Sequence, residues 1–302
     1  MLGTALPASL LEDHFLRRLE RLSLVARRPA AGGIGGDYRG RSRAHSADFV
    51  DYRAYTPGDD LRRIDWNVYQ RLDQVYMKLA EGHEHLVTHL VVDCSASMDW
   101  GTPNKLAYAR ALAAAVGYVA LGRNDVVSAS YVGTHATSLA RLRGRGRALD
   151  LLRFLDHARS DGQLDLFASL TRLSFNQLSG GRAGGQVVLI SDLLVPLESL
   201  ARALEYLLAT QLDAIVVHVL SPGECEPEVG GDMVLVDAET GRQVHVGVSL
   251  NAVSRYLRRL EAWQEDVAAI CTQRGVRYVR ARTDEPLEAV VLTRLRERLI
   301  LA

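Results

Sequence analysis

From residue 86 onward the sequence alternates between short apolar runs and longer amphipathic stretches, and this alternation constrains the fold more than any other feature. The apolar runs have the length and β-branched content of buried strands, whereas the amphipathic stretches repeat with helical spacing. Such alternation implies a largely parallel sheet with helices on both faces. Strands are expected at residues 86–93, 125–132, 186–192, 213–220 and 276–281, and helices at 105–121, 148–157, 166–177, 198–210 and 250–274.

Three further segments add to this alternation. Residues 135–139 are expected to form a short antiparallel edge strand. Residues 233–246, with the turn sequence Asp-Ala-Glu-Thr-Gly at 237–241, predict a β-hairpin inserted at about residues 228–248. A last helix is expected over residues 284–299. Residues 86–302 are therefore predicted to form one α/β domain with an inserted hairpin.

The first 35 residues predict an amphipathic helix followed by a Gly-rich linker. Apolar side chains recur on one stripe of residues 9–28, and arginines occupy the other face. Three arginines at 39–43 follow the linker and could bind RNA or phosphate, but a solvated linker explains them without any ligand. Because Lys plus Arg and Asp plus Glu both total 36, no net field attracts nucleic acid. The solvated linker is the favoured interpretation.

Residues 36–85 are neither cleanly helical nor cleanly alternating. The part from Tyr55 to Trp66 combines several arginines and aspartates with two aromatic anchors. An ion-pair network could clasp this segment to the side of the main domain, or the same residues could form a partner surface. We favour the clasp, which divides the chain into residues 1–35, a packed segment at 36–85, and the main domain at 86–302.

Cysteine usage and hydropathy indicate a cytoplasmic protein without a membrane span. The three cysteines are widely spaced and form no Cys-x-x-Cys motif, which argues against a disulfide framework and a structural zinc site. Glu12 and Asp13 precede any long apolar run, so no secretory signal is expected. The longest uncharged stretch, residues 111–122, is shorter than the roughly 20 residues that a spanning helix needs.

An apolar run at residues 90–92 leads directly into Asp93-x-Ser95-x-Ser97. One carboxylate and two hydroxyls are thereby placed where a buried strand reaches solvent. Oxygen ligands at alternate positions suit Mg²⁺ or Mn²⁺ better than zinc, which prefers nitrogen and sulfur. The sequence therefore predicts a hard-cation site in this turn.

The turn lies between a strand and a helix for which Thr102 is the expected N-cap and Pro103 the first residue. It therefore occupies the carboxyl end of a strand, where open parallel sheets bind ligands. A second carboxylate, Asp192, follows the apolar run 187–190. If the two strands are neighbours, Asp93 and Asp192 face one cleft and repel each other unless a cation, a proton or an arginine intervenes. Alternatively, each aspartate caps the loop after its own strand.

Together, Asp93-x-Ser95-x-Ser97 and Asp192 resemble the metal-ion-dependent adhesion site of von Willebrand factor A domains. Residues 48–66 closely resemble the signature of the bacterial domain of unknown function 58 family, and the hairpin is similar to one in that family. The resemblance covers roughly residues 36–299. It implies a Rossmann-like, doubly wound sheet of order 3-2-1-4-5-6, a Mg²⁺ site at its top, and functional company with MoxR-type AAA+ ATPases.

The resemblance also implies how each residue would hold the ion. Ser95 and Ser97 would bind it directly, and Asp93 and Asp192 partly through water. A threonine that completes the family's site is replaced here by Leu164, which offers no oxygen. Asp165 or water would have to substitute, so weak binding of Mg²⁺ or Mn²⁺ is expected.

The favoured function is a non-enzymatic interaction module that acts with a MoxR-type ATPase or its client protein in chaperone-like assembly or maturation. The alternative is a Mg²⁺-dependent phosphoryl or ester hydrolase that uses Asp93 as nucleophile or metal ligand. The sequence contains no Gly-rich phosphate loop, and Lys105 is the basic residue placed nearest either acidic turn.

Two further groups of residues have both a structural and a functional interpretation. His83, His85 and His89 share strand parity and could bind zinc, although core or solvated histidines are the favoured interpretation. Cys94 lies within the metal motif and could be a nucleophile, but alternation points it into the sheet as a small buried residue.

Overall fold

The computed structural model describes residues 13–22, 48–56, 64–72, 74–81, 86–173, 175, 185–227, 231–247 and 249–297. The chain divides into two compact units, one made of residues 1–30 with 86–302 and the other of residues 31–85. The N-terminal helix thus belongs to the larger unit. Whether residues 36–85 clasp the main domain stays a prediction.

The smaller unit consists of two antiparallel strands, β1 (Asp48–Ala54) and β2 (Tyr76–Glu81), with α2 (Trp66–Leu72) between them in the sequence. The amide of Asp65 donates to the carbonyl of Tyr76 at 3.0 Å, which ties the start of α2 to β2. Trp66 is 61% exposed and meets Tyr69 edge to face, with ring centroids 6.1 Å apart. This unit therefore contains a helix and paired strands, although its sequence is neither cleanly helical nor cleanly alternating.

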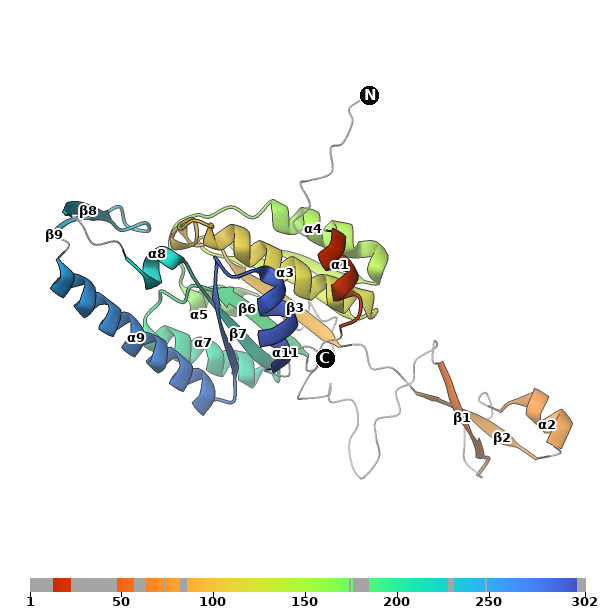
Figure 1. The fold of residues 1–302 in the computed structure, drawn as a ribbon. Coiled ribbons are helices and arrows are strands. Elements are labelled where there is room, and N and C mark those ends of the chain that lie inside the picture. Colours follow the sequence, from red (N-terminus) through yellow and green to blue (C-terminus); the bar gives the residue numbers. More distant parts are fainter. Residues whose placement is uncertain are drawn as a thin grey trace. The chain divides into compact units, whose positions relative to one another are not determined.

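The larger unit is built on a six-stranded sheet in the order β10-β7-β6-β3-β4-β5. Its strands are β3 (Val87–Asp93), β4 (Val126–Val132), β5 (Thr137–Arg143), β6 (Gln186–Ser191), β7 (Asp213–Leu220) and β10 (Arg277–Arg282). All neighbours are parallel except β4 and β5. Numbered within this sheet, the order is 3-2-1-4-5-6, which confirms the expected von Willebrand factor A-like fold class (Figure 1).

Helices cover both faces of this sheet (Figure 1). Side chains of α1, α3, α4 and the C-terminal helical segment pack on one face, and those of α5, α7 and α9 pack on the other. Their bounds are α1 (Asp13–Leu19), α3 (Lys105–Gly122), α4 (Ala148–Asp156), α5 (Leu166–Arg172), α7 (Leu197–Ala209), α9 (Leu250–Gln273), α10 (Leu287–Ala289), η4 (Val290–Arg294) and α11 (Leu295–Glu297). Each face therefore has its own apolar cluster.

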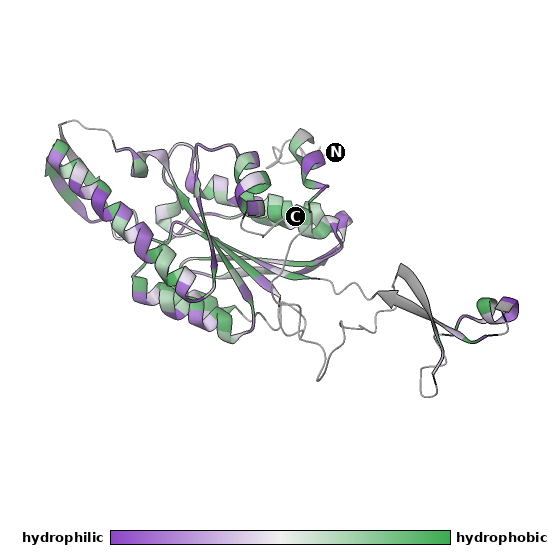
Figure 2. Cartoon of the chain, turned by 60° about the horizontal axis from the view of Figure 1, so that its bottom comes forward, coloured by the Kyte–Doolittle hydropathy of each residue, from purple (hydrophilic) through white to green (hydrophobic). Residues whose placement is uncertain are grey.

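The apolar clusters explain which elements are most deeply buried. Every described side chain of β3 is buried, as are those of β6 and β7. α3 is buried on nearly all sides, and a Cβ added to Gly117 would lie 2.3 Å from a side-chain carbon of Leu151 on α4. Figure 2 shows the hydrophobic strands of the sheet and the mixed surface of α9. Strand β3 and helix α3, which flank the Asp93 turn, are therefore anchored in the core.

Some element boundaries differ from the expected ones. α3 begins at Lys105 with Asn104 as its N-cap, because the Asn104 side chain accepts from the amide of Ala107 at 3.0 Å; the expectation of Thr102 as cap and Pro103 as first residue was wrong. α5 ends at Arg172, since Leu173 adopts an extended conformation. The edge strand β5 is longer than expected.

The inserted hairpin is present, formed by β8 (Asp232–Val236) and β9 (Gln243–Gly247) in antiparallel pairing. It connects α8 (Pro222–Cys225) to α9, whose N-cap Ser249 accepts from the amide of Ala252 at 3.2 Å. Among the described helices, none combines the length and the apolar character needed to cross a membrane.

Candidate functional site

The turns after β3 and β6 meet at the carboxyl edge of the sheet because these strands are parallel neighbours. The hydroxyl of Ser191 donates to Oδ2 of Asp93 at 2.5 Å and joins the two turns directly. Asp93 and Asp192 are each 1% exposed. The structure therefore brings together the two acidic turns that the sequence singled out.

Each aspartate also caps the turn that follows its own strand. Oδ1 of Asp93 accepts from the amide of Ser95 at 2.8 Å, and Oδ1 of Asp192 accepts from the amide of Leu194 at 3.2 Å. Leu193, the residue after Asp192, is fully buried and has a φ of 54°, a conformation that costs free energy for a residue with a branched side chain. Each aspartate thus caps its own turn, and the two turns also meet at the same edge of the sheet.

The two serines of the first turn lie beside each other. Oγ of Ser95 and Oγ of Ser97 are 3.0 Å apart, within η2 (Ala96–Met98) and its N-cap. The amide of Ala96 donates to the carbonyl of Gly162 at 2.9 Å, which fastens this turn to the loop before α5. Gly162 has a φ of 59°, and a Cβ there would lie 1.9 Å from Oγ1 of Thr134, so only glycine fits.

The loop before α5 contains Leu164, at the position where the resemblance to A domains predicts a threonine. Leu164 is half-buried and packs against the apolar cluster of α5 and α7. Oδ1 of Asp165 accepts from the amide of Ala168 at 2.9 Å and caps α5. Asp165 is thus engaged as a helix cap, and an ion at this edge would take no oxygen from the Leu164 side chain.

Lys105 supplies a positive charge to the edge. Its side chain is 1% exposed, and its Nζ lies 2.7 Å from Oδ2 of Asp192 and 2.7 Å from Oε1 of Glu224. Glu224 is held in α8, where its Oε2 accepts from the amide of Ser221 at 2.7 Å. Burial opposes the charge on Lys105, but Asp192 and Glu224 outweigh it and raise the pKa of the amine above its ordinary value. Lys105 is therefore an ammonium ion at neutral pH.

The protonation of Asp93 also affects its repulsion by Asp192. Burial and, to a smaller extent, the charge of Asp192 raise the pKa of Asp93 to about 7, although hydrogen bonds from Ser191 and Ser95 oppose the shift. Asp93 is thus partly protonated at neutral pH. A proton on Asp93 and an ammonium beside Asp192 resolve the repulsion that the sequence predicted. Hereafter, Asp93, Ser95, Ser97, Lys105, Asp192 and Glu224 are called the carboxyl-edge site.

A pocket of about 370 Å³ opens beside Lys105. Its rim includes Trp100 and Leu194, whose side chains are 48% and 50% exposed. The turn of the β8–β9 hairpin forms another wall, and Oδ1 of Asp237 accepts from the amides of Glu239 and Thr240 at 2.9 and 2.8 Å to order that turn. The lining residues are Ser97, Trp100, Lys105, Leu194, Glu224, Val236, Asp237, Ala238 and Glu239.

The inserted hairpin therefore contributes to the same edge as the acidic turns. Burial raises the pKa of Glu239, and the charges of Asp192 and Asp237 add to the effect. Among the described residues, no three His, Cys, Asp or Glu side chains converge to hold a metal. A divalent cation at this edge would thus depend on the hydroxyls of Ser95 and Ser97 as well as on carboxylates.

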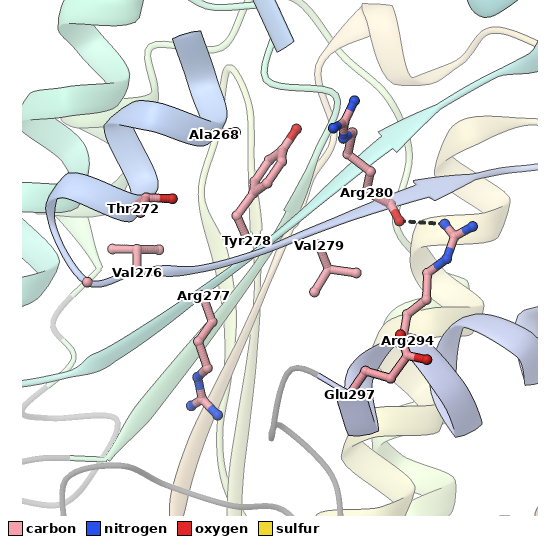
Figure 3. Close-up of a pocket in the computed structure, with 10 residues that line it drawn as sticks. Ala268, Thr272, Val276, Arg277, Tyr278, Val279, Arg280, Arg294 and Glu297 are labelled. Carbon is pink, nitrogen blue, oxygen red and sulfur yellow. Dashed lines mark hydrogen bonds between the residues drawn. The ribbon is translucent and has the colours of Figure 1, made fainter. Parts of the chain in front are cut away.

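A larger pocket of about 710 Å³ lies along β10 (Figure 3). Its arginines have partners within the protein: Arg277 pairs with Asp213 at 2.5 Å, and Nη1 of Arg294 donates to the backbone carbonyl of Arg280 at 2.7 Å. The larger pocket includes none of the residues that the sequence singled out. Despite the size of this pocket, we place the candidate site at the carboxyl edge, where the two predicted acidic turns meet Lys105 and Glu224.

The other candidate groups are held inside the core. Nδ1 of His89 lies 2.6 Å from Oγ of Ser128, and burial lowers the pKa of His89 to about 4. His83 and His85 lie outside the described residues. Cys94 is buried as expected, and burial raises the pKa of its thiol to about 12, which leaves it unreactive. His218, on β7, is likewise buried, and burial lowers its pKa to about 4.

Sequence reasoning missed two members of this network. Ser191 stands directly before Asp192 at the strand end, and its hydroxyl also accepts from the amide of Leu193 at 2.9 Å. Glu224 was signalled only by the spacing Ser-x-x-Glu from Ser221, which is typical of a capping box and is present in the structure. Nothing in that spacing indicates that Glu224 also contacts Lys105.

Comparison with known proteins identifies the family. The sequence model of the family described as "Protein of unknown function DUF58" matches residues 51–266. An uncharacterized protein of Mycobacterium tuberculosis, Rv1480, is 30% identical over 272 residues, which cover 88% of this chain and 84% of the relative. Mb1516 of Mycobacterium bovis matches to the same extent.

Solved structures with lower similarity include BatB from Bacteroides thetaiotaomicron, at 15% identity and a TM-score of 0.45, covering 70% of this chain and 98% of BatB. A von Willebrand factor type A protein from Catenulispora acidiphila has 16% identity and a TM-score of 0.36, covering 48% and 35%. On the family match and the sequence relatives, together with the strand order of the main sheet, the chain belongs to the DUF58 family and carries a von Willebrand factor A-like domain.

Proposed function

We propose that this protein is a non-enzymatic interaction module that presents the carboxyl edge of its main sheet to another protein. The observation that carries the proposal is the pocket beside Lys105, where exposed Trp100 and Leu194 surround buried charged groups. An exposed aromatic ring at the rim of a concave, partly polar surface is typical of residues that dominate binding energy in interfaces.

A divalent cation is the finer part of this proposal. Asp93, Ser95, Ser97 and Asp192 would bind Mg²⁺ or Mn²⁺ weakly, with a carboxylate of the partner filling the open position. The adjacent hydroxyls of Ser95 and Ser97 fit such an ion. Leu164 and the contact between Lys105 and Asp192 both reduce the oxygen atoms on offer, so the donor set fits the ion only in part.

The proposed partner is a MoxR-type AAA+ ATPase or its client protein, as the family resemblance implies, in chaperone-like assembly or maturation of other proteins. A hydrolase would require an accessible acid or base close to Asp93. His89 and His218 are buried, and Lys105 is engaged by two carboxylates. These contacts favour the interaction module.

The test uses the MoxR-type ATPase encoded in the same genome, immobilised and titrated with this protein. Ser95→Ala with Ser97→Ala, and separately Trp100→Ala, should each weaken binding by about tenfold or more, the magnitude expected for interface anchors. Leu149→Ala is the matched control, because Leu149 is 37% exposed and lies in the first turn of α4, which follows the end of β5 that pairs with the amino end of β4. Binding that survives both edge changes would show that the partner contacts another surface.

Chelation distinguishes the contribution of the metal to partner binding from that of the protein surface. If the ion contributes to binding, EDTA should weaken the interaction of the wild type and leave that of the double serine variant unchanged. A Mg²⁺-dependent hydrolysis of a generic phosphate ester that Asp93→Ala abolishes would instead support the hydrolase.

A further inference from the structure

We propose that the ammonium group of Lys105 is the resident cation of the carboxyl-edge site, and that a divalent cation reaches Asp192 only by displacing it. The inference rests on the proposed function and names the residue that controls metal binding within it. Lys105 is the group whose position decides whether Asp192 can contribute to an ion.

The contacts of Lys105 carry this proposal. Nζ lies 2.7 Å from Oδ2 of Asp192, and the other oxygen of Asp192 accepts from the amide of Leu194. Both carboxylate oxygens therefore already have a partner within the protein. A metal ion that uses Asp192, directly or through water, would be repelled by a positive charge a few ångströms away unless it displaces the ammonium.

The burial of Lys105 makes the competition strong. Its side chain is 1% exposed, so water screens its charge only slightly. A buried ammonium is retained only where carboxylates compensate it, and Lys105 has two such partners at equal distances. A second cation at Asp192 would face repulsion of the same weakly screened kind.

Glu224 provides the alternative position for the displaced ammonium. Because Oε1 of Glu224 already lies 2.7 Å from Nζ, a small side-chain rotation can release Asp192 and keep Lys105 paired. The backbone amide of Ser221 fixes the other oxygen of Glu224. The two carboxylates thus allow Lys105 to exchange places with a metal without leaving a buried charge unpaired.

Lys105 also couples the ion to the interaction surface. It lines the pocket together with Trp100 and Glu224, and Nζ is 5.9 Å from the centroid of a Trp100 ring. Displacing the ammonium from Asp192 changes the charge distribution that a partner meets in this pocket. Metal occupancy and partner binding therefore depend on the same side chain.

The experiment is a calorimetric titration with Mn²⁺ of the wild type, Lys105→Met, and Lys105→Met combined with Glu224→Gln. The double variant removes one positive and one negative charge, so the net charge of the site stays as in the wild type. It should nevertheless bind Mn²⁺ at least about tenfold more tightly, because Asp192 is freed from a cation in contact with it. Adding Asp93→Ala to the double variant should abolish the gain, which locates the ion at this site.

Equal Mn²⁺ affinity of the wild type and the double variant would overturn the proposal. Circular dichroism checks that each variant folds. If the double variant does not fold, Lys105→Gln combined with Glu224→Gln serves the same purpose, since the new amide can still donate to Asp192 while the net charge stays as in the wild type, and unchanged affinity in that variant would overturn the proposal equally. A gain seen only in Lys105→Met would also count against it, because net charge alone would then explain the gain.

The failure of this proposal can be distinguished from the failure of the proposed function. If the double serine variant loses the ATPase but the Lys105 variants bind Mn²⁺ like the wild type, the interaction module stands and the role of Lys105 falls. If Mn²⁺ binding tightens while the serine changes leave partner binding intact, the role of Lys105 stands and the interaction surface must be sought elsewhere.

Discussion

The hydroxyl of Ser191 donates to the carboxylate of Asp93 across 2.5 Å and so links the ends of two neighbouring parallel strands. The same hydroxyl accepts from the amide of Leu193, the residue with a left-handed backbone conformation. One side chain therefore satisfies a buried acceptor and a buried donor. This double role makes Ser191 a sensitive position for the stability of the edge.

Ser191→Ala should lower the free energy of unfolding by about 1–3 kcal/mol, because it leaves two buried polar groups without their partner. Urea denaturation followed by circular dichroism measures the loss. The control is Ser130→Ala, whose hydroxyl bonds to that of Ser138 on an exposed edge strand. Water can replace that partner, so the control should lose less; equal losses would mean that the link to Asp93 is energetically unimportant.

Asp93→Ala should abolish Mn²⁺ binding to the carboxyl-edge site. Asp93 is the carboxylate of the turn that carries both serines, and without it an ion would have two hydroxyls and an Asp192 that is already paired with Lys105, a set too weak for detectable binding. Isothermal titration of the wild type and the variant provides the comparison. Equal heats from both proteins would mean that the ion binds elsewhere or does not bind.

Leu164→Thr should tighten divalent cation binding, because the hydroxyl restores an oxygen at the position where the family resemblance places one. Leu164→Val is the matched control, since valine has nearly the shape of threonine but no hydroxyl. Both variants lose some packing against the α5 and α7 cluster. Tighter Mn²⁺ binding by the threonine variant alone supports the alignment of this loop, and identical affinities would show that the loop has another use.

Acid should destabilise the main domain through His89. Burial lowers the pKa of His89 from 6.5 to about 4, so between these values the unfolded chain binds a proton that the folded chain does not. The stability that His89 supports is therefore present above pH 6.5 and is lost as the pH falls toward 4. The loss attributable to His89 between pH 7 and pH 5 is about 2 kcal/mol.

Comparison with His89→Gln isolates this effect from opposing groups. Asp125, whose pKa burial raises to about 6, acts in the reverse direction between pH 4 and 6. Its contribution is the same in both proteins, so the difference between their urea midpoints as a function of pH reports His89. Parallel pH profiles for the two proteins would refute the assignment.

The strands of the main sheet could be predicted because buried parallel strands are continuous apolar runs, whereas their order was implied by the family resemblance. The start of α3 could not, since the sequence offers two capping side chains, Thr102 and Asn104, and only the position of the turn decides between them. β1 was missed because a register shift between Phe49 and Asp51 interrupts the alternation that marks a strand.

The candidate site was predictable to the extent that its chemistry is local. Asp93 and its serines lie in one turn, and Asp192 ends an adjacent strand. The partners of Lys105 were not predictable, because Asp192 and Glu224 are 87 and 119 residues away in the sequence. Contacts at such separations depend on how helices are placed on the sheet, and periodicity carries no information about that placement.

The burial of α3 on nearly all sides determines how fast this edge can respond to a ligand. A helix so tightly fitted, with Gly117 against Leu151, cannot slide or rotate without disturbing the domain core, a motion of microseconds or longer. Lys105 is the first residue of this helix, so its Cα is stationary and its four-carbon stem alone is free to move. Moving its ammonium away from Asp192 while it stays paired with Glu224 is a rotamer transition, and the edge can therefore adjust its charge while the backbone beneath it remains still.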